Sequence, residues 1–108
     1  MKKFAFVVCC LSVYLLFTQY SSRTTADQWV DSVFQSLSKE EKIAQLMVVR
    51  AHSNLGADHV QGVTELIRKY NVGALCFFQG GPMRQANLTN YYQAIAKTPL
   101  MVTIDGDD

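Results

Sequence analysis

The 108-residue sequence has almost no net charge and few cysteines. Ten Lys and Arg against nine Asp and Glu leave a formal charge of +1, which provides no basic surface for a nucleic-acid backbone. Three cysteines are too few for a disulfide framework. Charged residues make up 18% and hydrophobic residues 49%, which is too apolar for a disordered chain. The composition predicts at most one small folded domain without a nucleic-acid partner.

The N-terminus predicts a signal peptide at residues 1–26. Two lysines precede an apolar stretch at residues 4–17 that is broken only by Ser12. Polar residues follow at 19–23, and small residues at 24–26. This order is typical of a cleaved secretory leader. The stretch is short for a membrane span, which needs about 20 residues. We expect a secreted or periplasmic protein with no stable membrane insertion after cleavage; an uncleaved anchor helix is the alternative.

Apolar spacing predicts alternating helices and strands in the remainder, residues 27–108. Side chains that recur every three to four positions predict helices, and Ser38 with Glu41 fits a capping box at the start of one. Continuous apolar runs predict strands of a parallel sheet, although helix and strand compete over residues 46–49. The expected helices are 30–37, a short one after Ser38, 58–70 and 82–97, and the expected strands are centred near residues 48, 75 and 102.

These strand centres recur at about 27 residues, a normal period for repeated βα units. A doubly wound sheet and a closed (β/α)8 barrel share this pattern. In both architectures, binding sites lie beyond the carboxyl ends of the strands. Asp105 follows the strand at 100–104 directly and is the most suggestive residue at that edge. The alternative is that Asp105 and Gly106 form a turn.

Other candidate residues carry weaker signals. His52 and His59 are the only histidines, and with no Cys or Glu at ligand spacing they predict no metal site. Residues 79–81, Gln-Gly-Gly, stand between a strand and a helix, where backbone N–H groups can bind phosphate, but the glycines also suit a tight turn. Cys76 lies in an apolar run and is expected to be a buried, unreactive thiol.

Four segments in order resemble glycoside hydrolase family 3. Residues 37–46 (LSKEEKIAQL) resemble the family's opening motif. Residues 72–82 (VGALCFFQGGP) are similar to its second strand and loop, and residues 84–93 (RQANLTNYYQ) to the following helix. Residues 99–106 (PLMVTIDG) resemble the third strand and its acidic terminus. The resemblance is closest to the β-N-acetylhexosaminidase branch.

The resemblance implies a retaining glycosidase that removes terminal β-linked sugars without a metal or cofactor. It implies that residues 27–108 form the first three βα units of a TIM (β/α)8 barrel, preceded by N-terminal helices and incomplete. Asp105 matches the position that binds sugar hydroxyls. The family's nucleophile and acid/base match no residue here, so we expect the chain alone to be inactive.

Three alternatives stay open. A β-glucosidase or β-xylosidase of the same family would act on a different β-linked sugar. A stand-alone secreted α/β module would bind sugar or nucleotide without turnover. A signal-anchored interaction domain would bind no small ligand.

Overall fold

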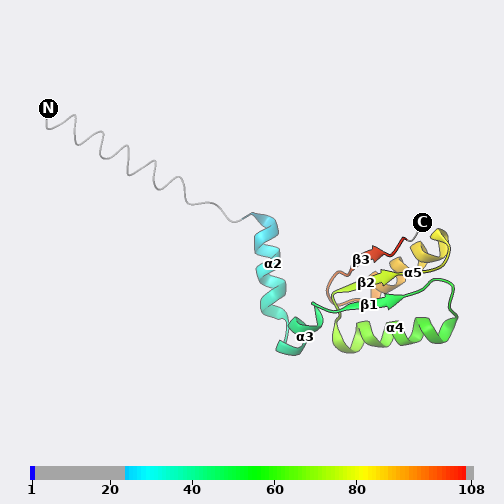
Figure 1. Ribbon diagram of the computed structural model, residues 1–108. Coiled ribbons are helices and arrows are strands. Elements are labelled where there is room, and N and C mark those ends of the chain that lie inside the picture. The colour runs from blue at the N-terminus through cyan, green and yellow to red at the C-terminus, as the bar shows by residue number, and fades with distance from the viewer. Residues whose placement is uncertain (2–23, 107–108) are drawn as a thin grey trace. The chain divides into compact units, whose positions relative to one another are not determined.

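The fold is taken from a computed structural model that describes residue 1 and residues 24–106. The chain forms two compact units, Met1–Ser32 and Val33–Asp108. The helices and strands, labelled in Figure 1, are α2 (Thr25–Ser36), α3 (Lys39–Ala44), β1 (Val48–Ala51), α4 (Ala57–Tyr70), β2 (Ala74–Phe77), α5 (Pro82–Ile95) and β3 (Met101–Ile104).

Most of the expected signal peptide, residues 2–23, lies outside the described residues. The last two residues of the predicted leader belong to α2, which begins at Thr25. The Asp27 carboxylate accepts hydrogen bonds from the N–H and hydroxyl of Thr24, at 3.1 and 2.7 Å. These bonds hold the pKa of Asp27 below its ordinary value. The predicted cleavage point after Ala26 therefore falls within the first turn of α2.

Among the helices of residues 24–106, none has both the length and the apolar content that a membrane span requires.

The predicted capping box is confirmed at the start of α3. The Glu41 N–H donates to Ser38 Oγ at 3.1 Å, and the Ser38 N–H donates to Glu41 Oε2 at 2.9 Å. Lys97 Nζ also pairs with Glu41 Oε1 at 2.6 Å. The Lys97 ammonium, and after it the Ser38 N–H, lowers the pKa of Glu41. The helix ends at Ala44, so residues 46–49 become a connection and the start of β1 rather than further helix.

The other predicted boundaries follow from Asn71 and Pro82. Asn71 adopts the left-handed conformation, with φ 57°, and donates its N–H to the Ile67 carbonyl, which ends α4. Pro82 occupies the first turn of α5, where its missing N–H leaves no bond unmade. The Asn71 side chain also bonds Thr98, which joins the turn before β2 to the turn before β3.

The three strands form one parallel sheet in the order β1-β2-β3. The register aligns Ala51, Phe77 and Ile104 at the carboxyl ends of the strands. Strand order follows chain order, so crossovers of one hand place α4 and α5 on the same face of the sheet. The buried core contains side chains of both helices and of this face: Ala51, Val63, Ile67, Val72, Leu75, Phe77, Tyr92 and Leu100.

The expected TIM barrel is wrong for the described chain. Residues 24–106 contain three parallel strands and four helices, a small mixed α/β arrangement whose sheet is open at β1 and β3. A closed barrel requires strand number, tilt and stagger to match. Strands and helices alternate with the same period in open and closed sheets. The period in the sequence therefore could not distinguish an open sheet from a barrel. A doubly wound sheet is not formed either, because α4 and α5 share one face.

The opposite face of the sheet is largely open to solvent. Arg50, Cys76 and Thr103 are aligned across it, and side chains on alternate positions share their direction. Val48 and Met101 on this face are 60% and 67% exposed. Cys76 is half-buried rather than buried as expected. β2 is therefore covered by helices on one face, not on both.

Candidate functional site

The carboxyl ends of the three strands meet at one edge of the sheet. The residues that follow the aligned strand ends are His52, Phe78 and Asp105. The Phe78 N–H donates to the Ala51 carbonyl at 3.1 Å, and the Asp105 N–H donates to the Phe77 carbonyl at 2.8 Å. These bonds continue the ladder beyond the strands. Asp105 therefore has a fixed backbone at the predicted edge, and its side chain is exposed.

Arg50 and Phe78 lie on the open face at this edge. The Arg50 guanidinium carbon is 5.2 Å from the centroid of the Phe78 ring, within cation–π range. The Phe78 side chain is 40% exposed. By alternation along β3, Asp105 follows Met101 and Thr103 on the same face. A cation, an aromatic ring and a carboxylate thus lie on one exposed sheet edge, a set of groups that can bind a polar, ring-shaped ligand.

Gly80 serves the packing of its loop against Ser53. The Ser53 N–H donates to the Gln79 carbonyl at 2.9 Å, and the Ser53 hydroxyl lies 3.4 Å from the carbonyls of Gln79 and Gly81. Gly80 has φ 123°, and a Cβ on it would overlap Ser53 Oγ. Of the two interpretations of Gln-Gly-Gly, this geometry favours the tight turn over the phosphate cradle.

Replacing Gly80 by alanine is expected to lower the free energy of unfolding by about 2–3 kcal/mol, because the methyl group meets Ser53 and the backbone conformation is strained. Urea denaturation followed by circular dichroism measures this loss. Gly106→Ala is the matched control, since a Cβ there has nothing within 4 Å. Equal stability of the two variants would contradict the proposed packing role of Gly80.

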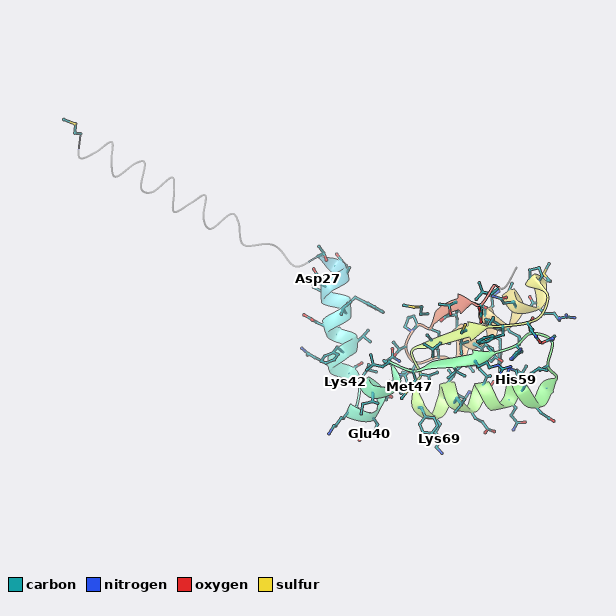
Figure 2. The ribbon with its side chains drawn as sticks, viewed as in Figure 1. Asp27, Glu40, Lys42, Met47, His59 and Lys69 are labelled. Atoms are coloured by element: carbon teal, nitrogen blue, oxygen red, sulfur yellow. The ribbon has the colours of Figure 1, made fainter. Side chains whose placement is uncertain are left out.

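The two histidines, for which the sequence predicts no metal site, form a pair. Arg50 Nε donates to His52 Nε2 at 2.7 Å, and the His52 N–H donates to His59 Nε2 at 3.0 Å. The two rings lie edge to face, with centroids 5.4 Å apart. Figure 2 places His59 at the N-terminal end of α4, beside the carboxyl end of β1, and Lys69 at the C-terminal end of the same helix. In the sequence, the only indication that His52 and His59 lie close together is that one short loop separates them.

His52 is 4% exposed, and its ring also stacks on Phe78 at 5.9 Å. Burial, and after it the positive charge of Arg50 and the nearby His59, lowers the pKa of His52. A neutral imidazole accepts at one nitrogen and carries its proton on the other. In the part of the chain that the structure describes, no three His, Cys, Asp or Glu side chains gather as metal ligands.

A hollow of about 510 Å³ lies between α5 and β3, lined in part by Pro82, Ala86 and Ile104. Val102 and Ile104 point to the helix-covered face, so this hollow is on the other side of the sheet from Arg50 and Phe78. The hollow is therefore separate from the carboxyl-edge site.

Comparison of the chain with models of protein families, with curated proteins and with solved structures finds no significant match in any of the three.

Proposed function

We propose that this chain binds a terminal β-linked sugar and acts within a retaining glycoside hydrolase similar to family 3, with β-N-acetylhexosamine as the preferred residue. The observation that supports the proposal is the position of Asp105. Its backbone is held at the carboxyl edge of a parallel sheet by the bond to Phe77, while its side chain stays exposed. Binding sites of parallel α/β sheets lie at this edge.

The chemistry of the edge suits a sugar. An ionised Asp105 accepts hydrogen bonds from two hydroxyl groups, each worth about 1.5–3 kcal/mol to a charged acceptor. The exposed ring of Phe78 offers an apolar surface to the face of a pyranose. Arg50, which lies over this ring, adds a donor for ring or substituent oxygens. In this proposal Asp105 binds substrate and forms no bond to the sugar carbon.

The proposed cellular location follows from the N-terminus. A leader cleaved after Ala26 would export the chain to the periplasm or the exterior. Glycosidic substrates of a secreted enzyme are met there. The order of lysines, apolar stretch and small residues supports this part of the proposal.

Asp105→Ala in the enzyme that carries this sequence is expected to lower kcat/KM by about tenfold to a hundredfold per lost hydrogen bond. Asp105→Asn keeps the shape without the charge and should recover part of this loss. Hydrolysis of an aryl N-acetyl-β-glucosaminide and of an aryl β-glucoside measures the effect and the preferred sugar. A preference for the glucoside would favour the β-glucosidase alternative.

Two controls make the result specific. Glu65→Ala removes an exposed carboxylate from the middle of α4 and should leave kcat/KM unchanged. Retaining hydrolysis needs a nucleophile and an acid/base, and the resemblance assigns neither role to a residue of this sequence. Residues 1–108 alone should therefore show no hydrolysis of aryl β-glycosides. Unchanged kcat/KM in Asp105→Ala would reduce Asp105 to a turn residue.

A further inference from the structure

We propose that His52 and His59 form a pH-operated latch, which holds the loop at residues 52–56 on the carboxyl edge of the sheet and releases it below neutral pH. The loop joins the end of β1 to the start of α4. The inference stands on the hydrogen bonds of the two imidazoles and does not depend on the proposed glycosidase activity.

Both histidines use Nε2 as a hydrogen-bond acceptor. His52 Nε2 accepts from Arg50 Nε, and His59 Nε2 accepts from the His52 N–H. An imidazole that accepts at Nε2 is neutral and carries its proton on Nδ1, whereas an imidazolium has two donors and no acceptor. Protonation therefore removes both bonds. At His52 it also places a second cation against the Arg50 guanidinium, 2.7 Å away.

The surroundings of His52 oppose a positive charge. Arg50 on β1, His59 on α4 and the Phe78 ring beyond β2 face its imidazole. Nδ1 is buried and has no hydrogen-bond partner. Burial first, and then the positive charge of Arg50 and the nearby His59, lower the pKa of His52. The closed loop thus favours the neutral ring.

The loop is tied to the candidate site through Ser53. Its N–H donates to the Gln79 carbonyl at 2.9 Å, and its hydroxyl lies 3.4 Å from two carbonyls of the next loop. Gly80 packs against the same side chain. Release of His52 would free Ser53, and with it the loop at residues 79–81. The latch therefore controls two of the three loops that border the edge.

The direction of the pH effect follows from proton uptake. A histidine whose folded pKa is lowered contributes stability that is present above its ordinary pKa, about 6.5, and lost as the pH falls through the folded value. The open loop binds protons that the closed loop excludes. Each such proton changes the opening equilibrium by up to about tenfold per pH unit.

Hydrogen exchange of the 108-residue chain between pH 7.5 and 5.0 tests the latch. After correction for intrinsic rates, the protection of the His52 and Ser53 amides should fall below about pH 6.5, with a slope that approaches tenfold per pH unit for one proton. The Thr98 amide, buried and bonded to Asn71 Oδ1, is the internal control and should keep its protection. Equal loss at Thr98 would indicate global unfolding and overturn the latch.

His52→Gln and His59→Gln identify the groups, because the Gln oxygen still accepts a hydrogen bond but does not titrate. Each variant should lower the slope, and the double variant should show constant protection. An unchanged slope in the double variant, or a flat wild-type profile, would overturn the proposal. His59 is partly exposed, so if His52→Gln does not fold, His59→Gln decides alone. An unchanged slope in that variant would overturn the latch, which requires both histidines.

Discussion

Gly73→Ala is expected to lower the free energy of unfolding by at least about 3 kcal/mol, the upper range for overpacking, because the obstacle is backbone rather than a flexible side chain. A Cβ at position 73 would overlap the carbonyl oxygen of Gln45 and lie 2.6 Å from its carbonyl carbon. The Gly73 N–H donates to the Ala44 carbonyl at 3.1 Å, and its own carbonyl accepts from Met101. Gly73 therefore joins α3, β2 and β3, and a shift to make room would break bonds on both sides.

Gly62→Ala is the matched control for Gly73→Ala. Gly62 is exposed within α4, and a Cβ there has nothing within 4 Å. Alanine should raise the free energy of unfolding at this position by about 0.5–1 kcal/mol through helix propensity. Urea denaturation of both variants measures the difference. A Gly73→Ala variant as stable as the wild type would contradict the close approach to Gln45.

Helix boundaries were predictable where a residue type has a specific role at a helix end. Ser38 with Glu41 formed the expected capping box, Pro82 took the first turn of α5, and Asn71 ended α4. In each case the signal and its partner lie within a few residues. Over residues 46–49 the apolar run left helix and strand in competition. Leu46 and Met47 lie between α3 and β1 and are 83% and 54% exposed. Their exposure depends on residues distant in sequence, which periodicity does not report.

Closure of the sheet depends on relations that spacing does not contain. The βα period predicted three parallel strands, which the structure confirms, and the structure places them in the order β1-β2-β3. It could not determine strand tilt or stagger, and these decide between an open sheet and a barrel. The barrel was expected only from the family resemblance. The described chain instead has an open sheet.

The site was predicted only where strand order alone determines position. The place of Asp105 follows from parallel strands that end together, so the sequence was enough. The His52–His59 pair depends on how one short loop turns back onto the strand end, and the Gly80–Ser53 contact joins two loops 27 residues apart in sequence. Pairwise geometry of this kind has no pattern in a single sequence.

Asn71→Ala is expected to lower the free energy of unfolding by about 3 kcal/mol, from about 1–2 kcal/mol for alanine in the left-handed conformation and the remainder from lost hydrogen bonds. Asn71 Nδ2 donates to Thr98 Oγ1 at 3.0 Å, and the Thr98 N–H donates to Asn71 Oδ1 at 3.2 Å. Both residues are buried. Alanine would leave the buried Thr98 N–H without an acceptor. Losing a hydrogen bond in the interior lowers stability more than losing one at the surface, where water replaces the acceptor.

Asn71→Gly separates the two causes. Glycine adopts a φ of 57° without strain, so this variant should lose only the part of the stability that comes from the Thr98 hydrogen bonds. Urea denaturation of the two variants should place alanine about 1 kcal/mol or more below glycine. If glycine equals the wild type, the Asn71–Thr98 bonds contribute nothing. If alanine equals glycine, the left-handed backbone carries no cost. The first of these results would leave the Gln45 side chain, which donates to the Asn71 carbonyl, as the contact that holds the turn before β2.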